Sequence, residues 1–211
     1  RHDGYMQEQL DTKKGRNLAL LEKSLAETPD DPYVHFQLGK QYDIQLQYAE
    51  ALPCYQRARE LVRNRPTWYH DLVVRTIECL RHEGRLEEAM IFASDEMPYW
   101  EQSADFYFVV GCLLLDQMQK HPEQGESLLP MIEESWLKAL AIGERPELAG
   151  NVSGRGSFMA AGQLWALFDA RKEAEKAARY KDMQKKLYAQ YKEAADAGLV
   201  SAAALPEQQP A

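Results

Sequence analysis

Residues 32–63 read PYVHFQLGKQYDIQLQYAEALPCYQRARELVR and decide the fold of the chain. Small and large apolar side chains recur in this stretch at helical spacing, on either side of a short predicted turn at residues 45–47. Small side chains let two antiparallel helices approach closely, while large ones fill the space between them. The spacing therefore predicts a helix pair. The small residues are Gly39, Ala51 and Ala58, and the large ones are Leu38, Tyr42 and Tyr55.

The order L-G-x-x-Y, then alanine, an aromatic residue and a last alanine, resembles one tetratricopeptide repeat. This resemblance implies an all-α fold, a right-handed superhelix of antiparallel helix pairs, which here would end in a long C-terminal capping helix. Such a match predicts packing, and packing alone does not name a function.

Weaker copies of the pattern follow. EGRLEEAM at residues 83–90 marks the turn of a second pair, and Val110-Gly111 stands at the Leu-Gly position of a third. The third pair fits only if about nine residues are inserted between its helices, in QMQKHPEQGES, which we expect to form a surface loop. We expect an arm at 1–12, a repeat domain at 13–197 and a flexible tail at 198–211. Within the repeat domain we expect a cap helix at 13–28 and helix pairs at about 32–64, 69–97, 103–142 and 157–197.

The composition limits the class of protein. A net charge of −8 argues against a general nucleic-acid binder, which needs a basic face to displace counterions from phosphates. No apolar run approaches the roughly 20 residues of a membrane-spanning helix, so we expect a soluble protein without a membrane span. Cys54, Cys79 and Cys112 are odd in number and far apart, which favours reduced thiols and a cytoplasmic location.

The chain carries no pattern of an enzyme active site. No catalytic triad order, Gly-rich strand-to-helix loop or metal-ligand spacing is present, so we expect no catalytic residue, metal or cofactor in this chain. Adjacent glutamates, such as Glu133-Glu134, point in different directions on a helix and are explained by a solvated face. The loop from Gly154 to Ser157 precedes a helix and could present amide groups to an anion.

The remaining candidate site is the concave surface of the superhelix, which in such repeats is lined by the second, fifth, ninth and twelfth positions of each first helix. Its mixture of aromatic and charged side chains suits peptide recognition, but in a short array the same residues could pack against the capping helix. The Lys/Asn clamp of chaperone-binding repeats is absent, because Phe36 and Lys40 occupy its first two positions. The predicted groove residues are Tyr33, Phe36, Lys40, Asp43, Asp71, Val74, Glu78, Arg81, Asp105 and Phe108.

The opening HDGY and the following KKGRNLALLEKSLAETPDDPYVHFQLGKQY resemble the junction in bacterial family-two glycosyltransferases that carry a C-terminal tetratricopeptide region. In that family an H-x-G-Y element closes the sugar-nucleotide domain, a K-x-x-R-N-x-x-L-L helix opens the repeats, and P-D-D-P-Y follows. Here these elements correspond to His2–Tyr5, to Lys13 or Lys14 through Leu21, and to Pro29–Tyr33. The resemblance implies a catalytic domain upstream, of which the arm at 1–12 would be the remnant and for which His2 could serve as a metal ligand. It covers the chain only through residue 42.

Two main hypotheses follow. In the first, the chain is a non-catalytic scaffold, the C-terminal region of a bacterial glycosyltransferase, which positions an acceptor or mediates self-association. In the second, it is a free-standing adaptor that binds a peptide segment of a partner protein. An enzyme acting through these 211 residues alone is a third and less favoured hypothesis.

Overall fold

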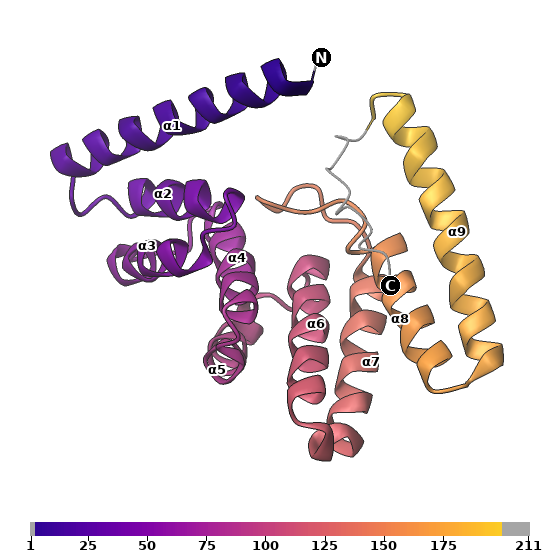
Figure 1. Cartoon of the computed structure of the whole chain (residues 1–211). Helices are drawn as coiled ribbons and strands as arrows, with labels where there is room; N and C mark the ends of the chain where they lie inside the picture. The colour runs from indigo at the N-terminus through magenta and orange to yellow at the C-terminus, as the bar shows by residue number, and fades with distance from the viewer. Residues whose placement is uncertain (1–2, 200–211) are drawn as a thin grey trace. The chain divides into compact units, whose positions relative to one another are not determined.

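The computed structural model of the chain describes the backbone of residues 3–199 and the side chains of residues 15–199. Within that range the secondary structure is helical, without a β-strand. The chain divides into two compact units, Arg1–Ala89 and Met90–Ala211. The all-α fold of antiparallel helix pairs is confirmed (Figure 1).

The first unit contains α1 (Asp3–Glu27), α2 (Pro32–Ile44), α3 (Tyr48–Leu61) and α4 (Tyr69–His82). The helix α5 (Leu86–Glu96) begins in this unit and ends in the next. Proline at the first position of α2 and the side chain of Asp31, which accepts hydrogen bonds from the next two backbone amides, fix where α2 begins. The expected helix pair at 32–64 is present, and α1 packs against α2.

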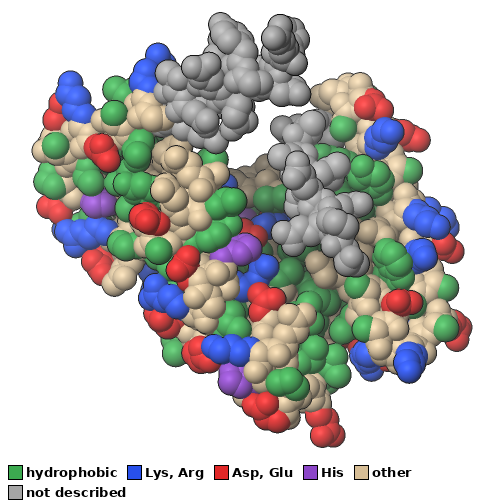
Figure 2. Space-filling view, viewed as in Figure 1, with side chains coloured by type: hydrophobic (Ala, Val, Ile, Leu, Met, Phe, Trp, Pro, Cys, Tyr) green, Lys and Arg blue, Asp and Glu red, His purple; other side chains and the backbone are tan. Residues whose placement is uncertain are grey.

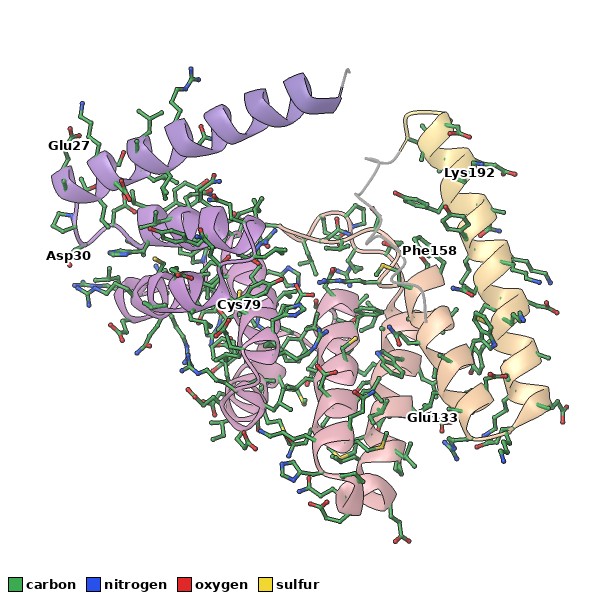
Figure 3. All side chains as sticks on the ribbon, viewed as in Figure 1. Glu27, Asp30, Cys79, Glu133, Phe158 and Lys192 are labelled. Atoms are coloured by element: carbon green, nitrogen blue, oxygen red, sulfur yellow. The ribbon has the colours of Figure 1, made fainter. Side chains whose placement is uncertain are left out.

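The second unit contains α6 (Ala104–Lys120), α7 (Gly125–Ile142), α8 (Phe158–Ala170) and α9 (Ala174–Asp196). Short 3₁₀ turns, η1 (Met97–Tyr99) and η2 (Pro122–Gln124), precede α6 and α7. Each helix packs against the next one along the chain, and the long last helix, α9, covers one side of α8. Phe158, at the start of α8, contacts Tyr188 and Tyr191 of α9 with ring centroids 5.2 and 5.1 Å apart (Figure 3).

Two predictions about segment boundaries are wrong. The segment 1–12, expected to be a loop or arm, is helical from Asp3 onward. It lacks an amphipathic pattern, but Met, Gln, Glu and Leu favour a helix and no proline interrupts it. Residues 1–2 and 200–211, which hold His2 and most of the expected tail, lie outside the described residues.

The expected surface loop at QMQKHPEQGES is the second error, because its residues instead lengthen both helices of the third pair. The helix α6 has 17 residues and α7 has 18, whereas α2 and α3 have 13 and 14. Only His121 and η2 lie between them, since proline at position 122 disfavours helical backbone at the residue before it.

The small residues of the repeat pattern stand where two helices touch. A Cβ atom added to Gly39 would lie 2.6 Å from two ring carbons of Tyr55, and one added to Gly111 would lie 2.4 Å from Nε1 of Trp136. Both rings are almost fully buried. The Trp136 indole also donates a hydrogen bond of 3.2 Å to the carbonyl oxygen of Phe108. The close approach expected from the sequence is therefore present in the first and third pairs.

Three of the turns within pairs place one residue in the left-handed backbone region. Gly84 has φ of 69°, whereas Leu46 and Lys172 adopt φ of 59° and 60° despite carrying side chains. In each case the backbone amide of the following residue donates a hydrogen bond to the carbonyl oxygen five residues before it, which caps the end of the preceding helix. After α8 no glycine stands at the turn, and Lys172 takes the left-handed position.

Candidate functional site

The predicted groove residues of the first unit meet in an ion-pair network between α2 and α4. The ammonium group of Lys40 lies 2.8 Å from Oδ2 of Asp71, and Nε of Arg75 lies 2.6 Å from Oδ1 of the same carboxylate. Nη1 of Arg75 lies 2.5 Å from Oδ2 of Asp43. Lys40, Asp43, Asp71 and Arg75 are hereafter the charged network.

The charged network is balanced and partly buried. The two carboxylate side chains are 14% and 5% exposed, at Asp43 and Asp71 respectively. Burial opposes the charged form of Arg75, but the attraction of Asp71 and the hydrogen bond to Asp43 outweigh burial and raise the pKa of the guanidinium. Two cations face two anions, so the network holds the helices together and has no excess charge for a ligand.

Tyr55 anchors this network to the core. Its hydroxyl donates a hydrogen bond of 3.1 Å to Oδ2 of Asp43. Burial, followed by the negative charge of Asp43, raises the pKa of Tyr55. The phenol therefore stays protonated and remains a donor across the neutral pH range.

An aromatic cluster lies beside the charged network. The ring of Trp68 stacks on Phe36 with centroids 4.9 Å apart and an interplanar angle of 20°, and it lies 5.7 Å from Tyr33 at 58°. Phe36 is 2% exposed, Trp68 is partly exposed and Tyr33 is 48% exposed. Tyr33, Phe36 and Trp68 are hereafter the aromatic platform: Phe36 forms its base, and the other two rings face solvent.

Sequence reasoning missed two members of this site, Trp68 and Arg75. Trp68 directly precedes α4, outside the helix positions considered for the groove. Arg75 lies one helical turn after Asp71, so an i,i+4 pairing could have been foreseen. Of the other predicted residues in the first unit, Val74 is buried, while Glu78 and Arg81 are half-buried on α4.

The predicted groove residues of the second unit contact the chain's own connection between α7 and α8, residues 143–157. Oδ1 of Asp105 accepts a hydrogen bond of 2.8 Å from the amide of Val152 and lies 3.5 Å from Nη1 of Arg155. The Arg155 guanidinium also lies 5.6 Å from the ring centroid of Phe108. Asp105 and Phe108 are both buried. A ligand-binding role for the ten groove residues stays a prediction.

The predicted anion-binding loop, residues 154–157, is the last part of the same connection. The amide of Gly154 donates a hydrogen bond of 3.0 Å to Oε1 of Glu144, and the hydroxyl of Ser157 donates to the same oxygen. A carboxylate of the chain thus occupies these donors.

A shallow groove of about 450 Å³ lies on the second unit, along α7 and the turn before α9. Within its lining, the guanidinium of Arg171 forms a salt bridge of 3.0 Å with Glu133, which is labelled in Figure 3. Arg171 also lies 2.7 Å from Glu173, so the positive charge in the groove is compensated. The lining residues are Glu126, Leu129, Pro130, Glu133, Glu134, Leu137 and Arg171.

Basic and acidic side chains are interspersed over the face shown in Figure 2. Among the described residues, no three His, Cys, Asp or Glu side chains are grouped closely enough to hold a metal ion. The three cysteines are free thiols, and burial raises the pKa of Cys79. Within the same described range, no helix is both long and apolar enough to cross a bilayer.

No protein-family model matches the chain, and no curated protein matches it. Solved structures do. The fragment of MamA from residue 41 to the end, from Desulfovibrio magneticus RS-1, superposes with a TM-score of 0.66 at 14% identity, over 89% of this chain and 93% of that one. YrrB, described as a TPR (tetratricopeptide-repeat) protein with an unusual peptide-binding site, gives 0.59 at 15% identity, over 91% and 87%.

The chain has a tetratricopeptide-type fold. PilF of Pseudomonas aeruginosa supports the same conclusion, with a TM-score of 0.59 at 18% identity over 87% of this chain and 75% of PilF. At these identities the similarity shows the fold alone, so function has to be argued from the site.

Proposed function

We propose that the chain is a helical-repeat scaffold that binds a peptide segment of a partner protein at the aromatic platform. The observation that carries the proposal is the packing of Tyr33, half-exposed, against Trp68 over a buried Phe36. Aromatic rings held in place beside a polar rim are typical of the residues that dominate binding energy in protein interfaces. The described peptide-binding site of YrrB supports a peptide as the ligand class.

The charged network contributes by holding the platform in place. It links α2, which carries two of the rings, to α4, which begins directly after Trp68. A surface already held in its binding conformation loses less conformational entropy when a ligand arrives. The network therefore acts in binding by positioning the rings.

Selection from a random peptide library on the intact chain tests this proposal. Tyr33→Ala and Trp68→Ala should each raise the dissociation constant of the selected peptides by about tenfold, because rings at the centre of an interface carry much of its binding energy. Tyr99→Ala is the matched control, since Tyr99 is 55% exposed and lies outside the platform. Unchanged affinity in both platform variants, or equal loss in the control, would refute the proposal.

A second proposal concerns the parent protein, which we infer to be a bacterial glycosyltransferase whose C-terminal accessory region is this chain. It rests on the sequence resemblance from His2 to Tyr33. Part of that run has a clear structural purpose here: Asp31 of P-D-D-P-Y caps α2 through a 2.8 Å hydrogen bond from the amide of Tyr33. In this proposal the scaffold positions an acceptor or a second copy of the chain in the cytoplasm, where three free thiols remain reduced.

The parent reading frame tests the second proposal. A sugar-nucleotide domain with an Asp-x-Asp motif should be encoded upstream of Arg1. An upstream sequence without such a domain would refute this proposal and leave peptide binding untouched.

A further inference from the structure

We infer that the connection between α7 and α8 acts as an internal ligand of the second unit, and that it occupies a site built for an arginine-bearing turn of a partner protein. The site is formed by Asp105 and Phe108 on α6 and is hereafter the α6 site. It belongs to the second unit and shares no residue with the aromatic platform, so it is a site additional to the proposed function.

The connection reaches the α6 site through one short turn. The amide of Val152 donates a hydrogen bond of 2.8 Å to Oδ1 of Asp105, and Nη1 of Arg155 lies 3.5 Å from the same oxygen. The amide of Arg155 donates to the carbonyl oxygen of Val152 at 3.2 Å, which closes a β-turn over residues 152–155. The side chains of Asp105 and Arg155 are only 2% and 9% exposed. The turn therefore fills the α6 site as closely as a bound ligand would.

Two glycines let the connection come this close. Gly154 has φ of 105°, and a Cβ added to it would lie 2.5 Å from the ring of Phe158. A Cβ added to Gly156 would lie 2.3 Å from the carbonyl oxygen of Gly143. Backbone atoms cannot move aside as the end of a flexible side chain does, so a side chain at position 156 has to displace part of the connection.

The chemistry of the α6 site favours arginine as the ligand side chain. Asp105 provides a buried carboxylate, and Phe108 provides a ring whose centroid lies 5.6 Å from the Arg155 guanidinium. A guanidinium is planar and weakly hydrated, so one group can pair with a carboxylate and also lie over a ring. The ammonium of lysine is more strongly hydrated and loses more on burial. A partner segment therefore needs arginine at the fourth position of the turn and, for the positive φ, glycine at the third.

The α6 site is closed in the free chain because the turn is joined to the chain at both ends. Such a segment has an effective concentration of about 1 mM or more at its own site, so a free segment with the same contacts does not compete at micromolar concentration. A partner thus binds the α6 site once the turn is displaced. The buried ion pair suits such an exchange, since desolvation offsets much of its attraction and an equivalent pair replaces it.

Nuclear magnetic resonance of the ¹⁵N-labelled intact chain tests the inference, followed at the amides of Asp105 and Phe108. The probe is the blocked peptide GNVSGRGS, a copy of residues 150–157. Two variants displace the turn in different ways: Arg155→Ala removes the guanidinium, and Gly156→Ala disturbs the backbone contact with Gly143. Both should bind the peptide at least about tenfold more tightly than the unaltered chain, with a dissociation constant of about 1 mM or below.

Controls separate recognition of arginine from general loosening of the chain. Peptides with lysine or alanine in place of the arginine should bind each variant at least about tenfold more weakly than GNVSGRGS. Pro146→Ala changes an exposed position of the connection and should behave like the unaltered chain. Adding Tyr33→Ala to either displaced variant should change the peptide affinity by less than about twofold, because the aromatic platform is a separate site.

Circular dichroism establishes that each variant is folded before titration. Hydrogen exchange of the unaltered chain tests displacement without any substitution: the amide of Val152 should exchange at least about tenfold faster than the buried amides of α6, through local opening. Exchange of Val152 only at the rate of those amides overturns the inference. Equal binding of the peptide by the unaltered chain, no binding by a folded variant, or equal binding of the lysine peptide overturns it as well.

Discussion

Adding one methyl group at Gly39 or Gly111 tests the packing that defines the fold. Replacing glycine by alanine inside a helix normally stabilises it by about 1 kcal/mol. Here the new Cβ would lie 2.6 Å from the Tyr55 ring or 2.4 Å from the Trp136 indole, and both rings are almost fully buried. Real Cβ atoms do not approach other atoms so closely, so the ring or the helix has to move.

The expected size of each effect follows from opposing terms. Overpacking a core by one methyl group destabilises by about 1–3 kcal/mol, which outweighs the helix preference of alanine. Gly39→Ala should therefore lower the free energy of unfolding by about 1 kcal/mol. Gly111→Ala should lower it by about 2 kcal/mol, since displacing Trp136 also lengthens the indole hydrogen bond to the carbonyl of Phe108.

Urea unfolding followed by circular dichroism measures these changes. Gly15→Ala is the matched control: apart from its chain neighbours and the nearby backbone of α1, no atom lies within 4 Å of a Cβ added to Gly15, so this change should stabilise the fold by up to about 1 kcal/mol. Tyr55→Leu provides the decisive background, because it removes the ring that Gly39→Ala would strike. If Gly39→Ala is equally destabilising with leucine at position 55, the overlap is not the cause and the reasoning is refuted.

Three further predictions use the same unfolding assay. Leu46→Gly and Lys172→Gly should each raise the free energy of unfolding by about 0.5 kcal/mol, because glycine adopts positive φ without strain, whereas Gly84→Ala should lower it. A lower unfolding free energy in either glycine variant would contradict the assignment of these residues to the helix ends. Arg75→Ala should lower the free energy of unfolding by about 3 kcal/mol, because Asp43 and Asp71 each lose one charged partner and keep only Tyr55 and Lys40 respectively. Converting both aspartates to asparagine in that background should restore part of the loss. Burial raises the pKa of the Cys79 thiol above its ordinary value of 9.0, so the thiol stabilises the fold fully below pH 9.0, and this stabilisation falls by about 1.4 kcal/mol per pH unit above it. Cys79→Ala should reduce this alkaline loss of unfolding free energy, and an equal loss in the variant would contradict the prediction.

The sequence predicted the helix pairs well because their signals are local. Pro32 and the preceding aspartates mark the start of α2, and Gly39 with Tyr55 reports a contact within one pair, so both can be read without knowing the rest of the fold. The surface loop predicted before Gly125 was wrong because an inserted segment can lengthen two helices as easily as it forms a loop. The spacing of the repeat residues alone does not distinguish these two outcomes.

The candidate site was only partly predictable, because its assembly depends on contacts between helices. Lys40, Asp43 and Asp71 were chosen by position, but the pairs between α2 and α4, Lys40 with Asp71 and Asp43 with Arg75, became visible only in three dimensions. Trp68 lies before its helix, where repeat numbering assigns no role. Position within a repeat indicates which way a side chain points, whereas its partners depend on the neighbouring repeat.

The connection between α7 and α8 offers a place to splice in another protein. Its two ends already meet: a Cβ on Gly156 would lie 2.3 Å from the carbonyl oxygen of Gly143, and Glu144 binds the amide of Gly154. Between these ties, Glu147 and Gly150 are exposed. A reporter domain inserted there would leave the flanking helix ends fastened by the existing contacts, and lengthening a closed loop costs little entropy. The connection is thus a suitable insertion site for a fluorescent or affinity domain within the second unit.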